Sequence, residues 1–131
     1  MVILDACAVI GFIYAEPGAE VVREILYTEQ CAIHAINLCE VYKDCLDRSN
    51  PSDADAIIDD LRDIGLITRE DLDEAIWKQV GRLKNTLRSN IAWADCYAIA
   101  LSQRLQGRVL TADKEFEPVQ DKNICPVQFF R

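Results

Sequence analysis

Four acidic residues are the side chains of this sequence with the most potential for chemistry. Asp5 ends an apolar run at the N-terminus, and Asp113 follows a second apolar run at residues 108–111. Glu40 lies about one turn beyond a third run at residues 31–36, and Asp95 interrupts an apolar helix. If these runs are parallel strands, their carboxyl ends share one edge of a sheet, where functional crevices lie. We therefore expect the four carboxylates to converge there.

Asp95 is the most informative of the four. It is the only charged residue between Ile91 and Leu101, and a helical wheel places it on a narrow polar strip with Ser102 and Gln106. An acid in a largely buried helix is rarely left without a partner. Ser89 or Asn90 is better placed to cap this helix, so the sequence predicts a functional role for Asp95 rather than a capping role.

The other three acids have structural alternatives. Asp5 and Asp113 follow strands, where aspartate is common as a helix N-cap or turn former. Asn37 and Glu40 fit a capping box, with Asn37 as the N-cap and Glu40 at the third helical position. Pattern alone favours this structural reading for Glu40, whereas its place beyond a strand end favours function.

Convergent carboxylates repel one another, and a divalent cation removes that cost. A set of oxygen ligands without His or Cys suits Mg²⁺ or Mn²⁺ rather than zinc. The single histidine, His34, lies inside a predicted apolar strand, so no histidine base is available. The sequence contains no glycine-rich phosphate loop, no dinucleotide fingerprint and no Gly-x-Ser-x-Gly elbow. These features point to metal-assisted hydrolysis of a phosphodiester.

Length and composition indicate one globular domain. The chain has 131 residues, of which 50% are hydrophobic and 27% charged, and we expect a single domain over residues 1–131. No apolar run is long enough to span a membrane, and no signal peptide is recognisable, which predicts a cytoplasmic protein. The net charge of −8 disfavours general nucleic-acid binding. A local phosphate-contacting rim would need basic residues such as Lys43, Arg48, Lys84, Arg88 and Lys114.

The six cysteines are interpreted as small hydrophobic residues rather than as disulfide or zinc ligands. They form no C-x-x-C pair, and most have apolar neighbours. They occur at positions 7, 31, 39, 45, 96 and 125.

Predicted strands and helices alternate along the chain. Strands are expected at residues 1–5, 31–36, 65–68, 108–111 and 124–129. Helices are expected at residues 6–15, 18–28, 53–64, 70–87 and 91–105, with another beginning at Asn37. This alternation predicts the α/β class: a single-domain α/β/α sandwich with a central parallel sheet.

Five segments of the sequence resemble those of PIN-domain nucleases, and in particular the VapC-type ribonuclease toxins of toxin–antitoxin systems. The segments are Val-Ile-Leu-Asp-Ala-Cys-Ala-Val-Ile at 2–10, Glu-Pro-Gly-Ala-Glu at 16–20, Ile-Asn-Leu-Cys-Glu-Val at 36–41, Trp-Ala-Asp-Cys-Tyr-Ala-Ile-Ala-Leu at 93–101 and Val-Leu-Thr-Ala-Asp-Lys-Glu-Phe at 109–116. The order and spacing of the acids, together with Thr-Ala-Asp, carry the resemblance.

The resemblance implies an endoribonuclease that depends on Mg²⁺ or Mn²⁺. It matches Asp5, Glu40 and Asp95 to the three core acids of the family and Asp113 to a fourth, more variable acid. It matches Thr111 and Asn37 to polar residues that support the site. It also implies a homodimer, an RNA substrate and a small DNA-binding antitoxin as partner.

One departure from the family pattern leaves an alternative open. Position 7 usually carries Ser or Thr, and here it is Cys7, whose thiol is a weak hydrogen-bond donor. The alternative is a catalytically weak PIN fold that binds RNA or protein. An aspartyl-nucleophile phosphatase would need a second aspartate at position 7, and a receiver domain would need paired acids near the first strand.

Overall fold

The centre of the molecule is a parallel β-sheet. The computed structural model describes residues 1–131 apart from the side chain of Ser89. The strands run in the order β3-β2-β1-β4-β5, and every neighbouring pair is parallel. Their bounds are β1 Val2–Leu4, β2 Cys31–His34, β3 Ile67–Arg69, β4 Arg108–Thr111 and β5 Val127–Phe129. Each of the predicted strands is present, and the parallel sheet is confirmed.

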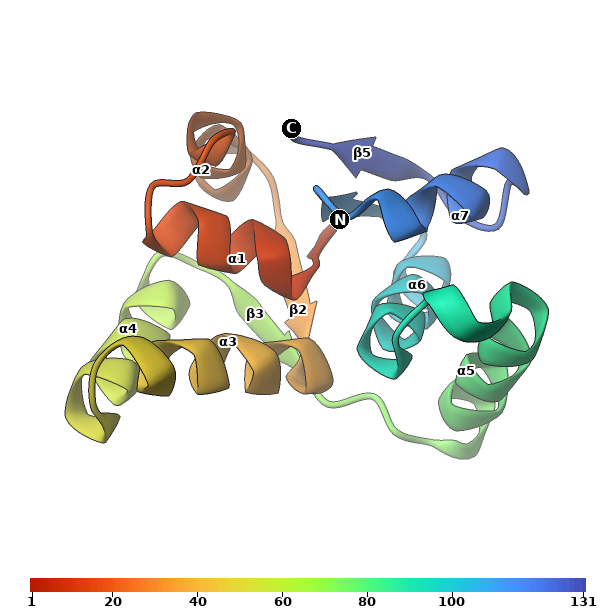
Figure 1. Ribbon diagram of the computed structural model, residues 1–131, viewed down its shortest axis with the longest axis horizontal. Coiled ribbons are helices and arrows are strands. Elements are labelled where there is room, and N and C mark those ends of the chain that lie inside the picture. Colours follow the sequence, from red (N-terminus) through yellow and green to blue (C-terminus); the bar gives the residue numbers. More distant parts are fainter.

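Helices cover both faces of the sheet. Figure 1 shows α1 to α4 on the left and α5 to α7 on the right, with the strands between them. The bounds are α1 Ala6–Ile13, α2 Ala19–Thr28, α3 Ala35–Arg48, α4 Pro51–Asp63, α5 Glu74–Leu87, α6 Trp93–Leu105 and α7 Glu117–Asp121, with 3₁₀ turns at Arg88–Asn90 and Lys114–Phe116. Within the described residues, no helix has the length and apolar character needed to cross a membrane.

Alternation along the strands explains the two helical layers. Val2 and Leu4 of β1 pack into the cluster formed with α1 to α4. Ile3, between them, points to the opposite face and packs against Ala98 and Leu101 of α6. Successive side chains of a strand point to opposite faces, so an apolar strand with no polar residue is buried on both sides. The continuous apolar runs in the sequence therefore predicted the sandwich correctly.

His34 makes one helix begin earlier than predicted. Its Nδ1 accepts a hydrogen bond from the backbone N–H of Ile36 at 3.1 Å, so His34 is the N-cap of α3. The other ring nitrogen, Nε2, then carries the proton and donates to the backbone oxygen of Asp71 at 2.9 Å. The predicted strand at residues 31–36 ends at His34, and the predicted capping box of Asn37 and Glu40 is wrong because both residues lie inside α3.

Gly18, just before α2, has a backbone conformation and close contacts that a larger residue would disturb. It has φ +89°, and an added Cβ would lie 2.6 Å from the backbone oxygen of Phe130. We expect Gly18→Ala to lower the free energy of unfolding by about 2–4 kcal/mol in urea denaturation. Gly81→Ala is the matched control, because nothing lies within 4 Å of its added Cβ. That helical substitution should stabilise the protein by about 0.5–1 kcal/mol, and equal effects of both substitutions would contradict the prediction.

Candidate active site

Asp5 is held in place at the junction of β1 and α1. It is the N-cap of α1, and its Oδ1 accepts from the backbone N–H of Ala6 at 2.7 Å. Its Oδ2 accepts from the Thr111 hydroxyl at 2.8 Å and from the Cys7 thiol at 3.3 Å. The side chain is 3% exposed. Burial raises the pKa of the Asp5 carboxyl, although these hydrogen bonds act in the opposite direction.

Thr111 connects Asp5 to Asp113. Its Oγ1 donates to Asp5 and accepts from the backbone N–H of Asp113 at 3.0 Å. The Asp113 carboxylate accepts from the backbone N–H of Glu115 at 2.9 Å, so it also begins the 3₁₀ turn that follows β4. Two acids separated by more than 100 positions in the sequence are therefore linked through one hydroxyl group. This contact gives a physical reason for the support that the sequence resemblance assigned to Thr111.

Asp95 is buried at the first turn of α6. It is 7% exposed, and its Oδ2 accepts from the backbone N–H of Ala92 at 3.2 Å. The prediction that Asp95 has no capping role is therefore wrong, because it satisfies the N-cap backbone of its own helix. Ala92 occupies the N-cap position, and the predicted capping role of Ser89 lies outside the described residues.

Asp95 also lies in an electrostatic environment that a helix-capping role does not require. Burial raises the pKa of the Asp95 carboxyl to about 7, and the negative charge of Asp5 is the next largest cause. Asp113 and Glu40 act in the same direction. The four predicted acids therefore lie close enough to influence one another, although they come from four separate parts of the chain.

Glu40 and Asn37 are presented by the first half of α3. Burial, followed by the charge of Asp5, raises the pKa of the Glu40 carboxyl. Asn37 is fully buried, and its Nδ2 donates to the backbone oxygen of Ala94 at 3.1 Å. This bond ties α3 to the first turn of α6, next to Asp95. The Oδ1 of Asn37 has no hydrogen-bond partner among the described residues.

The four carboxylates are suitable ligands for a hard dication, although in this conformation their oxygens are not grouped around one metal position. None of the four acids takes part in an ion pair within the described part of the chain. Carboxylate oxygens are the ligands that Mg²⁺ and Mn²⁺ prefer. Among the described side chains, however, no three His, Cys, Asp or Glu residues are grouped closely enough to hold one ion. Binding would require side-chain rotation, and Glu40 has room for it because it lies at the surface.

Two of the five basic residues considered for a phosphate-contacting rim are already neutralised. Lys43 pairs with Asp47 at 2.6 Å, and Arg48 pairs with Asp44 at 2.9 Å. Lys84, Arg88 and Lys114 form no ion pair with a described carboxylate. The positive charge available to a phosphate therefore lies mainly at the C-terminal end of α5 and after β4.

The cysteines are free, and most are core residues as predicted. Cys31, Cys45, Cys96 and Cys125 are buried, and Cys39 is exposed on α3. Cys7 is half-buried beside Asp5, and burial raises the pKa of its thiol to about 12. Cys7 is therefore a neutral thiol that can donate to the Asp5 carboxylate.

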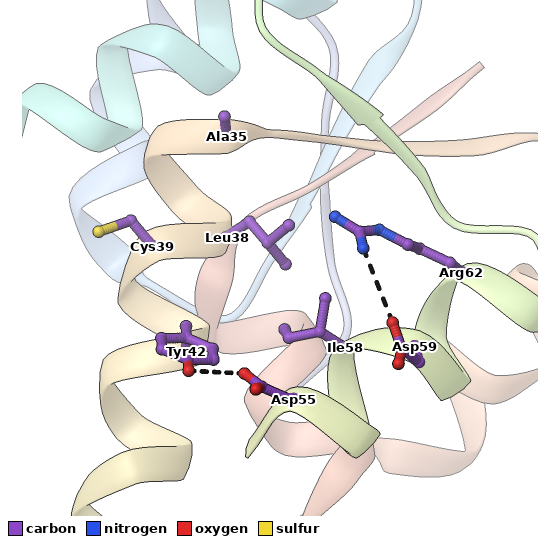
Figure 2. A pocket seen from close by; sticks show the side chains of 8 residues that line it. All are labelled: Ala35, Leu38, Cys39, Tyr42, Asp55, Ile58, Asp59 and Arg62. Carbon is purple, nitrogen blue, oxygen red and sulfur yellow. Dashed lines mark hydrogen bonds and ion pairs between the residues drawn. The ribbon is translucent and has the colours of Figure 1, made fainter. Parts of the chain in front are cut away.

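A groove between α3 and α4 lies apart from the acids. Figure 2 shows its lining, in which the Tyr42 hydroxyl donates to Asp55 at 2.6 Å and Arg62 faces Asp59 at 3.8 Å. The cavity has a volume of about 520 Å³ and also contacts Leu38 and Ile58. None of the four acids lines it, so this groove is not the place of the proposed chemistry.

A parallel sheet with several carboxylates near the carboxyl ends of its strands defines an α/β protein with a candidate dication site. The chain belongs to the PIN domain family, whose model matches residues 2–122. PIN domains are typically nucleases, and PIN nucleases generally use divalent metals. None of the curated proteins compared with the chain matches it.

Solved structures of toxin–antitoxin proteins share the fold. VapBC-1 from nontypeable Haemophilus influenzae has a TM-score of 0.75 at 22% identity, covering 99% of this chain and 98% of that one. VapBC2 from Rickettsia felis, bound to a promoter DNA fragment, has a TM-score of 0.74 at 12% identity, with 98% of each chain covered. Mycobacterium tuberculosis VapC20, described as a Sarcin-Ricin loop cleaving toxin, has a TM-score of 0.71 at 10% identity, covering 91% of this chain and 95% of that one.

Proposed function

We propose that residues 1–131 form one PIN-like nuclease domain that hydrolyses RNA phosphodiesters with Mg²⁺ or Mn²⁺, and that this protein is the toxin of a toxin–antitoxin pair. The observation that carries the proposal is the burial of Asp95 near three other acids, none of which forms an ion pair with a described Lys or Arg. Such an arrangement is costly for the folded protein unless a dication binds there.

The proposed roles follow from the position of each residue. Asp5, Glu40, Asp95 and Asp113 would hold the metal, with Thr111 fixing Asp5 and Asn37 fixing α3 against α6. When bound, a divalent ion lowers the pKa of a water molecule and neutralises negative charge on a phosphate. We propose that Asp95 also accepts a proton from the attacking water, because a carboxylate beside the metal can act as a general base. Attack at phosphorus breaks the bond to O3′, which leaves a 5′-phosphate and a 3′-hydroxyl.

The test is cleavage of a fluorescent single-stranded RNA by the purified protein. We expect cleavage with Mn²⁺ or Mg²⁺, none with EDTA, and products that carry 5′-phosphate and 3′-hydroxyl ends. Contaminating metal-independent ribonucleases leave 2′,3′-cyclic phosphates and continue in EDTA, so end analysis separates the two sources. Absence of metal-dependent cleavage on several structured and unstructured RNAs would contradict the proposal.

Cys7→Ser tests the one departure from the family pattern. A hydroxyl donates to a carboxylate more strongly than a thiol, by a margin of about 1 kcal/mol. We therefore expect Cys7→Ser to cleave RNA about fivefold faster at limiting Mn²⁺, with a similar gain in metal affinity measured by calorimetry. Cys39→Ser, an exposed cysteine on α3, is the matched control and should change neither quantity. A slower Cys7→Ser enzyme would contradict the positioning role.

Partners follow from the structural relatives. Structures of VapBC proteins share this fold, so we propose that a small antitoxin protein binds this chain. The sequence resemblance to VapC-type toxins also implies a homodimer, which we propose for this chain. Co-expression with a short DNA-binding protein from the adjacent reading frame, followed by size-exclusion chromatography with light scattering, measures both associations.

A second candidate function is an RNA- or protein-binding PIN fold with weak catalysis. It is favoured by the absence of three metal-ligating side chains grouped around one point among the described residues. Calorimetry with Mn²⁺ separates the two functions. A dissociation constant for Mn²⁺ in the micromolar range or below supports the nuclease, whereas a binding module of this kind does not need such affinity.

A further inference from the structure

We propose that Trp93, with the Lys84 ammonium beside its ring, is a base-stacking site for single-stranded RNA at the start of α6, the helix that carries Asp95. The inference rests on the proposed function, and it names the element that would hold the substrate. Sequence reasoning missed Trp93 because one exposed aromatic residue at the start of a helix carries little information by itself.

Trp93 is an exposed aromatic side chain at the start of the helix that carries Asp95. It is the first residue of α6, two positions before Asp95, and it is 58% exposed. At about 100° per residue, Trp93 and Asp95 point to nearly opposite sides of α6. A base stacked on Trp93 would therefore belong to a nucleotide flanking the scissile phosphate rather than to the nucleotide that reacts.

A lysine from the neighbouring helix completes the platform. The C-terminal end of α5 leads through the 3₁₀ turn to α6, and Figure 1 shows the two helices side by side. The Lys84 ammonium lies 5.7 Å from the centre of the Trp93 ring and donates to the backbone oxygen of Ile91. This arrangement fixes a positive charge over one part of the ring, where a phosphate of a stacked nucleotide can reach it.

The positive charges at this end of α5 are not neutralised by carboxylates. Arg82, Lys84 and Arg88 form no ion pair with a described acid, whereas eight other Lys and Arg residues do. The chain as a whole carries a net charge of −8. These three cations lie on or just after the second half of α5, and one of them contacts an exposed aromatic ring, so this end of the helix has the charge and the stacking face that single-stranded nucleic acid requires.

Trp77 provides an internal comparison. It is 50% exposed on α5, and the Lys78 ammonium lies 5.7 Å from its ring centre. That ammonium pairs with Glu74 at 3.0 Å, so its charge is already neutralised. The two tryptophans thus match in exposure and in their cation contact, and they differ in the charge left for a phosphate.

A second copy of this chain is a poorer occupant of the same face. In a two-fold symmetric contact through Trp93, the basic residues of one copy would lie near those of the other. Lys84 and Arg88 form no ion pair with a described acid that would offset that repulsion. RNA phosphates neutralise the same charges, so RNA is the favoured occupant.

The test uses two variants of the full chain, each with one remaining tryptophan. Trp77→Ala leaves Trp93 as the fluorophore, and Trp93→Ala leaves Trp77. Each is titrated in EDTA with a short single-stranded RNA and with a duplex of the same sequence. The affinity of fluorescein-labelled RNA is measured in parallel by anisotropy, and kcat and KM for cleavage are measured with Mn²⁺.

We expect single-stranded RNA to quench Trp93 fluorescence and duplex RNA to leave it unchanged. Trp93→Ala should bind single-stranded RNA about tenfold more weakly than Trp77→Ala and show a higher KM with little change in kcat. Two results would overturn this proposal and leave the proposed function standing. The first is RNA binding or cleavage without a change in Trp93 fluorescence, and the second is equal RNA affinity of the two variants. A change in Trp93 emission that follows protein dilution or a protein partner, and not RNA, would assign the face to a protein contact and overturn it too. Failure of RNA both to bind and to be cleaved would overturn the proposed function together with this inference.

Discussion

Asp5→Asn is expected to reduce RNA cleavage by about a thousandfold or more while leaving the fold intact. Asp5 lies at the centre of the electrostatic coupling, since its charge raises the pKa values of both Asp95 and Glu40. Losing one carboxylate ligand removes several kcal/mol of charge stabilisation from a dication-dependent transition state. The asparagine oxygen can still accept from the backbone N–H of Ala6, so the N-cap of α1 is preserved.

Two measurements accompany that substitution. Far-UV circular dichroism and a urea titration report the fold, and a cleavage assay with Mn²⁺ reports the reaction. Asp121→Asn, an exposed acid at the end of α7, is the control and should cleave RNA at the rate of the unmodified protein. Full activity of the folded Asp5→Asn protein would remove Asp5 from the metal site.

Asp95→Asn is expected to stabilise the metal-free protein at pH 8. The folded protein keeps the Asp95 proton up to a pKa of about 7, whereas the ordinary aspartate value is 3.8. Unfolding therefore releases a proton between these two pH values, and stability falls as pH rises through that window. Removing the charge should recover part of this loss, with an upper limit of about 4 kcal/mol.

Urea denaturation at pH 4 and pH 8, with and without Mn²⁺, measures this effect. At pH 4 the variant and the unmodified protein should have similar stabilities, because Asp95 is then protonated in the folded state. At pH 8, Mn²⁺ should stabilise the unmodified protein and have little effect on the variant. A variant that is less stable at pH 8 would show that the bond from Ala92 to Asp95 outweighs the burial of its charge.

The sequence predicted the architecture well because β1, the central strand, is apolar throughout and the strands beside it, β2 and β4, have apolar interiors. Ile3 and its neighbours in β1 are buried on both faces, and only a central parallel strand needs such a run. The helix boundaries were harder to predict where one side chain decides them. His34 ends β2 by accepting from Ile36, and a histidine inside an apolar run gives little indication of such a cap.

Only part of the candidate site could be predicted from the sequence. Asp95 stood out because it was the single charge in an apolar helix, yet its bond to Ala92 depends on a side-chain conformation that spacing does not specify. The link from Asp5 through Thr111 to Asp113 joins residues far apart in the chain, so only the fold brings it together. Likewise, ion pairing of Lys43 and Arg48 depends on their neighbours along α3.

Asp5 is both the N-cap of α1 and a proposed metal ligand, and this combination matters for the design of a catalytically inactive variant. Alanine at this position would remove the acceptor for the first amide of α1, so loss of turnover could not be separated from loss of structure. Asparagine retains that acceptor and discards the charge. It is therefore the better choice for trapping an uncut nucleic acid, or for producing the protein safely in living cells.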